Sequence, residues 1–412
     1  MFIDRRIIVF VAAMLSHFAS GSEPETAVCD DELNEVVHGS NQFAVDLYQR
    51  LSENRATNII VSPQSIASVL AMTHAGANHQ TRQQIGDVLR TSMPSEKLHK
   101  AFERLLKTSA RGSKQPGIEL HVARNLWVQD VPIIHPHFLE ICRQRYGAEI
   151  AQLDCSSQTE AVRQAINSRV SDQTAGKIVD FLPAEMLANS TQLTLLDAVY
   201  FKGNWTHEFN ASETRASPFH TSVATHVTVP MMYQKTELRY AEFDDMEMLE
   251  LPYGLDGSIS MVVILPRSVE GLESLPKKLS MQKLNHYYQQ LEPKAVELHL
   301  PRFAVSSHLL LKPVLELMGV DHAFDPQRAD FSQISSDENL FLSNVIHKAN
   351  IEVTELGTSA AAATAAIVVS KGFEKQGSPP ISFRVDHPFM LLIRDNTTKC
   401  ILFIGKITDP SK

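Results

Sequence analysis

The spacing of apolar residues divides the chain into an early part rich in helices and a later part rich in strands. Phe43, Leu47 and Leu51 recur every four residues, which is typical of an amphipathic helix. Similar patterns predict further helices over 62–70, 94–110, 138–146 and 161–170. Alternating or continuously apolar runs predict strands over 58–61, 118–128, 148–153, 191–201, 246–251, 259–265, 296–303, 390–394 and 400–404. Such an order of elements predicts a mixed α+β fold.

One large hydrophobic core accounts for most of the chain. The chain has 412 residues, of which 43% are hydrophobic, and no long polar linker or internal repeat divides it. We therefore expect a single domain over 22–412. Residues 1–21 differ, because Arg5 and Arg6 precede a short apolar run and the small residues around Gly21 suit cleavage. The run is too short to cross a bilayer, so we expect a signal peptide and a secreted, extracellular protein without a membrane anchor.

Modification sites and cysteines agree with export without proving it. Four glycosylation sequons are present, and a glycoprotein is expected, although the second lies beside an apolar strand and is expected to be confined. They begin at Asn189, Asn204, Asn210 and Asn396. The four cysteines are Cys29, Cys142, Cys155 and Cys400. They allow three full pairings, among which the sequence does not choose, and their low density indicates a fold that does not depend on disulfides.

The motifs of common enzymes and cofactor sites are missing from the sequence. There is no Gly-x-Ser-x-Gly, His-Glu-x-x-His or phosphate-binding glycine loop. The 17 histidines are scattered without metal-binding spacing. The net charge of −9 argues against nucleic acid as a partner. We therefore expect no enzymatic activity, no cofactor and no metal.

An unusual stretch of small residues lies near the C-terminal end, over 358–366. No position in it carries a large side chain, so a helix here would have nothing to bury. As a strand it would present two faces small enough to fit between other strands, and Gly357 before it gives backbone freedom. By composition alone, a flexible alanine-rich loop is the simpler interpretation.

The flanks of this stretch change that interpretation. The run 342–350 leads through 352–354 to Glu355 ahead of it, and Asp386-His387-Pro388-Phe389 follows it. This order resembles the serpin family across about 40–410, whose members mostly inhibit serine proteases. The resemblance implies the serpin fold: one α+β domain with a large central mixed sheet, further sheets, about eight to nine helices and an exposed reactive-centre loop over about 355–380. It also implies that 174–183 forms a turn and a strand.

The resemblance implies suicide inhibition of a serine protease. The protease attacks a bait residue in the loop, and the cut loop inserts into the central sheet. Family spacing from Glu355 places the reactive bond at Lys371–Gly372, which suits a trypsin-like protease. The segment before Pro379 is longer than usual, so Lys375 is a second candidate for the bait. The hinge that must insert is Glu355, Gly357, Thr358, Ala360, Ala361, Ala362, Ala363 and Thr364.

A second set of residues matches the family's sheet-opening region. Ser62 and Ser65 are expected beneath the opening with His347, and Trp205 near the point where the loop enters. Asp197 departs from the family, which more often has Asn there. A carboxylate beside a buried histidine favours the charged imidazole, so opening could depend on pH, although a satisfied core histidine is the simpler interpretation. Arg302 is expected to pair with Glu355, against the alternative of two independent surface charges.

The helix predicted over 94–110 carries a basic stripe. Its members recur at helical spacing opposite the apolar face: Lys97, Lys100, Arg104, Lys107 and Arg111. The stripe suits either a solvated surface or a site for a heparin-like glycosaminoglycan, which some serpins bind on the equivalent helix. We therefore expect a monomeric inhibitor that forms a covalent complex with a trypsin-like protease. The alternatives are a serpin-shaped carrier or chaperone and an extracellular glycosaminoglycan-binding protein.

Overall fold

The computed structural model describes most of the chain, apart from the predicted leader, most of the predicted reactive-centre loop and several short segments. The described ranges are 30–53, 57–112, 115–129, 133–153, 159–184, 192–336, 340–356 and 379–412. The predicted signal peptide, Cys29, Cys155, Asn189, the hinge from Gly357 onward, Lys371, Gly372 and Lys375 lie outside them. Within the described ranges none of the helices combines the length and apolar composition needed to span a bilayer.

Helices dominate the first part of the chain, as predicted. The described α-helices are α1 Asp30–Ser52, α2 Pro63–Gly76, α3 His79–Val88, α4 Ser95–Gly112, α5 Pro136–Tyr146, α6 Thr159–Gln173, α7 Leu275–Lys278, α8 Met281–Gln290 and α9 Lys312–Leu317. Short 3-10 turns are η1 Ala211–Glu213, η2 Gly271–Glu273 and η3 His322–Phe324. Helix α2 is buried along its whole length, because α1, α3, α4 and α5 pack around it together with strands of both sheets.

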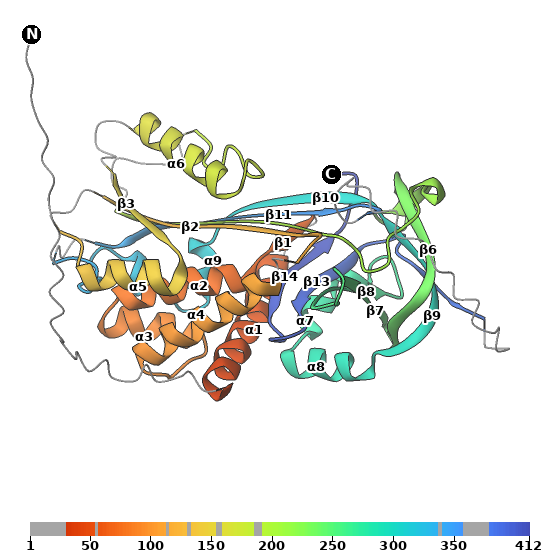
Figure 1. Ribbon diagram of the computed structural model, residues 1–412, viewed down its shortest axis with the longest axis horizontal. Coiled ribbons are helices and arrows are strands. Elements are labelled where there is room, and N and C mark those ends of the chain that lie inside the picture. Colours follow the sequence, from red (N-terminus) through yellow and green to blue (C-terminus); the bar gives the residue numbers. More distant parts are fainter. Residues whose placement is uncertain are drawn as a thin grey trace, which may run out of the picture.

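A five-stranded mixed sheet forms the long axis of the molecule (Figure 1). Its order is β10 Phe303–Leu310, β11 Leu342–Val353, β4 Leu193–Gly203, β2 Ile118–Gln129 and β3 Glu149–Leu153. Strands β4 and β11 lie side by side in parallel, while the contacts β10–β11 and β4–β2 are antiparallel. Helix α6 covers one face, and α2, α4 and α5 lie against the other (Figure 1). This is the large central mixed sheet that the sequence predicts.

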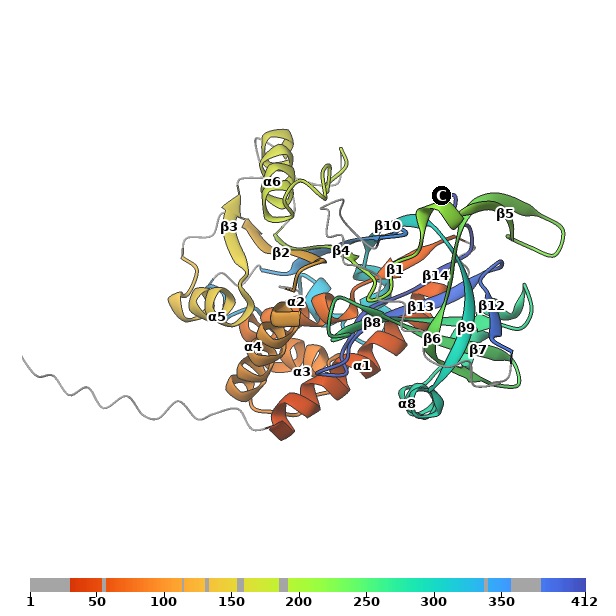
Figure 2. The ribbon, with the colours of Figure 1, turned by 45° about the vertical axis from the view of Figure 1, so that its right-hand side comes forward.

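A nine-stranded sheet fills the end of the molecule opposite helices α3 and α5 (Figure 2). Its order is β1 Ile59–Val61, β14 Ile401–Ile407, β13 Phe389–Asp395, β8 Ile259–Pro266, β7 Met246–Tyr253, β6 His226–Glu242, β9 Glu292–Pro301 and β12 Ile381–Arg384, with β5 Arg215–His220 paired to β6. Strand β1 pairs with β14 from the far end of the chain. Pairing over such a distance joins the N- and C-terminal parts into one unit.

Two predicted elements differ from the structure. The run 296–303 is two strands, which break at Arg302. Residues 174–183 form turns without a strand, so the turn is confirmed and the strand is wrong. The backbone N–H of Ile178 donates to Thr174 Oγ1, and Ala175 and Asp180 adopt positive φ. Local hydrogen bonds occupy backbone groups that a strand would pair with a neighbour, and the left-handed residues interrupt the extended backbone.

The described cysteines are both buried free thiols. They are Cys142 and Cys400, and burial raises the pKa of each thiol above its ordinary value. Any arrangement in which all four cysteines pair is therefore wrong. The fold relies on its apolar core, as the low cysteine density indicates.

Candidate functional site

A row of polar side chains crosses the five-stranded sheet. Arg124 on β2 is in register with Asp197 on β4, which is in register with His347 on β11. Side chains of in-register neighbours point to the same face of a sheet, and here that face meets α2. We call the boundary between β4 and β11 the seam. Asp197 and His347 face each other across it.

The bond across the seam is fully buried. His347 Nδ1 lies 2.8 Å from an oxygen of Asp197, and neither side chain is exposed. The backbone N–H of Ser62 donates to His347 Nε2 at 3.1 Å. Because Nε2 accepts a hydrogen bond, the hydrogen of the ring lies on Nδ1 and points to Asp197. The arrangement therefore holds a neutral imidazole, which favours the satisfied core histidine over the pH-sensitive opening.

Helix α2 supplies the rest of this network. Ser65 Oγ donates to the second oxygen of Asp197 at 2.5 Å. Ser62 is the N-cap residue and Pro63 occupies the first turn, as predicted, although the Ser62 side chain makes no capping bond. The structure thus brings Ser62, Ser65, Asp197 and His347 together, so both strands of the seam are tied to the same buried helix end.

An aromatic cluster holds the C-terminal end of β11. Trp205 Nε1 donates to the carbonyl of Thr354 at 2.9 Å. Its ring stacks on Tyr253 with the centroids 4.3 Å apart. Trp205 is therefore placed where the chain leaves the sheet toward the predicted loop.

Glu355 lies next to the end of the described segment that leads to that loop. It lies 3.4 Å from Arg302 and accepts a hydrogen bond from Thr214 Oγ1 at 2.9 Å. Its carbonyl also accepts from the N–H of Phe209 at 2.9 Å. The Glu355 side chain is 10% exposed and that of Arg302 is 48% exposed. The carboxylate thus has a hydrogen bond as well as a cation, so it is not an isolated surface charge.

The basic stripe on α4 is largely neutralised. Lys97 pairs with Glu32, Lys100 with Glu96, Arg104 with Asp30 and Lys107 with Glu103. Arg111 is exposed at the end of the helix. A polyanion would have to displace these carboxylates, which favours the solvated surface that the sequence left open.

The described sequons differ in how they use their amide groups. Asn396 Nδ2 donates to the carbonyl of Gly257 at 2.9 Å and to Ser260 Oγ at 3.1 Å. The Asn204 side chain packs against Gly117, whose backbone is so near that a Cβ there would lie 2.8 Å from Asn204 Cγ. Asn210 is exposed and uses only its oxygen, which accepts from Ser212. Asn210 is therefore the one exposed asparagine among the three described sequons, and its amide nitrogen is free for a glycan.

Sequence reasoning did not single out Arg124. It stands on the face of β2 that otherwise carries Leu120 and Val122, and it lines a cavity beneath the sheet. The signal was available, because an arginine in an alternating apolar run is exceptional. Its meaning depends on the neighbours that the fold supplies.

Comparison with known proteins decides the family. A model described as Serpin (serine protease inhibitor) matches residues 38–410. The chain is a serpin. It is 37% identical to a leukocyte elastase inhibitor of Xenopus laevis over 375 residues, which are 89% of this chain and 97% of the relative. The resemblance seen in the sequence is thereby confirmed, and the protein belongs to a family of protease inhibitors.

Solved structures confirm the serpin fold. Human thyroxine-binding globulin complexed with its ligand superposes with a TM-score of 0.83 at 29% identity, covering 92% of this serpin and 100% of that chain. Native protease nexin-1 with heparin superposes with a TM-score of 0.81 at 28% identity, covering 92% of this serpin and 99% of that chain. The same fold thus occurs in proteins with different ligands, so the function of this serpin must be argued from its own residues.

Proposed function

We propose that this serpin inhibits a trypsin-like serine protease as a suicide substrate, with Lys371–Gly372 as the reactive bond. The observation that carries the proposal is the parallel seam. Strand β11 ends at Val353 and leads directly toward the predicted hinge. A segment that folds back from its end runs antiparallel to β11, and therefore antiparallel to β4 as well. Insertion between them exchanges one parallel ladder for two antiparallel ones, which are slightly more stable.

The length of the predicted hinge agrees with this geometry. Residues 358–370 would span roughly 40 Å as a strand, and β11 and β4 have 12 and 11 residues. The residues over 358–366 are alanine, serine and threonine, without proline or charge to block entry. A full-length strand can therefore be accommodated.

The chemistry follows from a cut made before the loop inserts. The protease serine attacks the Lys371 carbonyl, the bond to Gly372 breaks, and the lysine remains esterified to the protease. Insertion moves β4 and β11 apart by about 4.8 Å, so the 2.8 Å bond between Asp197 and His347 must break. The network at the seam is therefore a barrier that the inserting strand has to overcome.

A denaturing gel of the mature serpin with near-equal trypsin tests the proposal. We expect a covalent band at the summed mass and a released fragment that begins at Gly372. Lys371→Ala should abolish the band, while the matched Lys375→Ala should retain it. A band lost only in Lys375→Ala would move the bait to Lys375. Clean cleavage with active trypsin would contradict inhibition and favour the carrier.

We further infer that residues 1–21 are removed during secretion and that 22–412 is the mature, monomeric, glycosylated protein. Support comes from the leader-like sequence and from the free amide of Asn210. Mass spectrometry of protein from the medium of expressing animal cells tests both points. A mature N-terminus near residue 22 with a glycan on Asn210 is expected. Protein retained in the cells with its first residues intact would contradict secretion.

Binding of a heparin-like glycosaminoglycan along α4 is the second candidate function. It is supported by the exposed cations Lys97, Lys107 and Arg111. It is also supported by the structural similarity to protease nexin-1, whose structure was solved with heparin. The carboxylates paired to the stripe weigh against it. A heparin column tests it with the double variant K107Q/R111Q. Elution above physiological salt that the variant loses would support binding, and elution at or below physiological salt would contradict it.

A further inference from the structure

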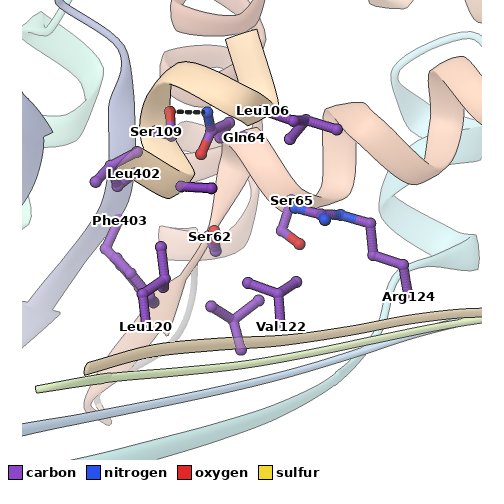
Figure 3. A pocket seen from close by; sticks show the side chains of 12 residues that line it. Ser62, Gln64, Ser65, Leu106, Ser109, Leu120, Val122, Arg124, Leu402 and Phe403 are labelled. Atoms are coloured by element: carbon purple, nitrogen blue, oxygen red, sulfur yellow. Dashed lines mark hydrogen bonds between the residues drawn. The ribbon is translucent and has the colours of Figure 1, made fainter. Parts of the chain in front are cut away.

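A cavity of about 240 Å³ lies under β2, between the five-stranded sheet and helices α2 and α4 (Figure 3). One side is apolar and is formed by Leu106, Leu120, Val122 and Phe403. Leu106, Leu120 and Val122 are only half-buried, which shows that the cavity reaches solvent. Apolar walls that are open to solvent can accept a hydrocarbon group.

Arg124 gives the cavity a positive charge. Its side chain extends from β2 toward Ser65 (Figure 3), and its Nε is buried without a hydrogen-bond partner among the described residues. No ion pair joins Arg124 to any described carboxylate. Asp197, the nearest opposite charge in register, already accepts hydrogen bonds from Ser65 and His347. Burial lowers the pKa of Arg124, and the Asp197 charge raises it; a guanidinium stays protonated in proteins.

The first turn of α2 adds a second positive feature. This helix has 14 residues, no acidic residue in its first turn and no side-chain cap. The N–H groups at its start point outward from the positive end of the helix dipole. Ser62, Gln64 and Ser65 all line the cavity, and Gln64 Nε2 donates to Ser109 Oγ at 2.8 Å at the far side (Figure 3). Arg124 and the helix start therefore face the same space.

We propose that this cavity binds a small amphiphilic monocarboxylate. Its carboxylate lies between the Arg124 guanidinium and the start of α2, and its hydrocarbon tail covers Leu106, Leu120 and Val122. A carboxylate matches the paired donors of a guanidinium. The nearby Asp197 and Asp395 carboxylates, the latter 3.4 Å from Ser109 Oγ, repel a second negative charge. That disfavours phosphate and other multivalent anions.

The site has a structural consequence. Its walls come from β2, β4, β14, α2 and α4, so a bound molecule connects β2 and β4 to the helices that pack against this face of the sheet. Such a ligand stabilises the five-stranded form that it binds. If the serpin traps a protease as proposed above, occupancy slows loop insertion; binding itself does not depend on that function.

Titration of the uncut, full-length mature serpin with octanoate tests the proposal, with calorimetry and the melting temperature as readouts. We expect saturable one-site binding and a rise in the melting temperature. Arg124→Gln should weaken binding roughly tenfold or more, because a charge-assisted contact is lost. Arg143→Gln, an exposed arginine of α5 outside the cavity, is the matched control and should bind normally.

Chemical and steric controls complete the experiment. 1-Octanol should bind much more weakly than octanoate, and acetate and inorganic phosphate should not bind measurably. Ala110→Phe, at the exposed edge of the cavity, should block octanoate without touching Arg124. It keeps the proposal testable if Arg124→Gln fails to fold. Equal binding of octanol, unchanged binding in both cavity variants, or phosphate binding in place of octanoate would overturn the proposal.

Discussion

The seam of the five-stranded sheet and two strands of the nine-stranded sheet differ in one respect: the seam carries a buried polar cluster among apolar neighbours, while β8 and β14 are almost purely apolar. Strands β8 and β14 are buried at every position, and almost all of their side chains are apolar. The seam instead places Asp197, His347 and Ser65 in full burial and joins them by hydrogen bonds. Packing holds both regions, and the seam adds a small number of directional bonds between side chains.

This difference suits two mechanical roles. Opening an apolar interior leaves cavities, whose cost grows with the volume left empty. A hydrogen-bonded boundary can exchange partners when a new strand enters, because that strand brings its own donors and acceptors. Without that strand, opening the boundary would leave buried groups unpaired, and this free-energy cost keeps the boundary closed. Under the proposed mechanism, the polar row is therefore the line at which the sheet would open without losing its core.

The largest effect is expected in the apolar sheet. Leu392 is buried on β13 between Ile404 of β14 and Val262 of β8. Leu392→Ala should lower the free energy of unfolding by about 2–5 kcal/mol, measured by urea denaturation. Complex formation with trypsin in the folded fraction should remain. A loss below about 1 kcal/mol would show that this sheet is not the rigid part.

A smaller effect is expected at the seam. Asp197→Ala removes the acceptor of both His347 Nδ1 and Ser65 Oγ, so the free energy of unfolding should fall by about 1–3 kcal/mol. The seam should also open more readily, which heat-induced polymer formation measures.

Asp197→Asn is the matched variant. It keeps one acceptor for His347 or Ser65, so both effects should be intermediate. Wild-type rates of polymer formation in Asp197→Ala would contradict the role of the network.

Acid should act on the helical layer through two other histidines. Burial is the main cause that lowers the pKa of His74 from 6.5 to about 4 and that of His99 from 6.5 to about 3. The unfolded chain therefore binds more protons below pH 6.5, so their stabilisation is present above that pH and is lost as the pH falls toward 4. Each should contribute up to about 1.4 kcal/mol per pH unit.

The non-titrating variant His99→Gln checks this pH dependence. Urea denaturation between pH 7 and 4.5 should show a shallower loss of stability for the variant than for the wild type. Equal slopes would show that His99 does not bind a proton on unfolding.

The smallest effect is expected at the loop end. Glu355→Gln removes the charge that faces half-exposed Arg302 but can still accept from Thr214. The free energy of unfolding should fall by only about 0–1 kcal/mol. Arg302→Gln should match it in thermal melts. A much larger loss in either variant would mean that this pair, rather than the seam, holds the sheet closed.

Local patterns were sufficient for many elements but not for their partners. The four-residue spacing in α1 and the hairpin of β13 and β14 follow from the sequence, because neighbours in the chain form them. The pairing of β1 with β14 does not, since periodicity carries no information on distant partners. Arg302 breaks a run that reads as one strand, and Thr174 closes a turn through its hydroxyl. The first outcome reflects a change of strand partner, from β6 before Arg302 to β11 after it, and the second a hydroxyl hydrogen bond; composition reveals neither.

The candidate site shows the same limit. Ser62, Ser65, Asp197 and His347 were grouped by family resemblance, and the structure gives the bonds between them. The neutral state of His347 required the Ser62 N–H, which only the fold brings to Nε2. The sequence alone could not assign a role to Arg124, because that role depends on the cavity that the fold places beside it.

The most direct test of the account locks the seam with a disulfide. Ala198 and Lys348 are in register across β4 and β11 on the face opposite Asp197, so cysteines there suit a bridge. The pair A198C/K348C is made with Cys29 and Cys155 changed to Ser. The oxidised protein should be cleaved by trypsin without a covalent complex, and reduction should restore the complex. A complex that forms equally well with the seam locked would contradict loop insertion between β4 and β11.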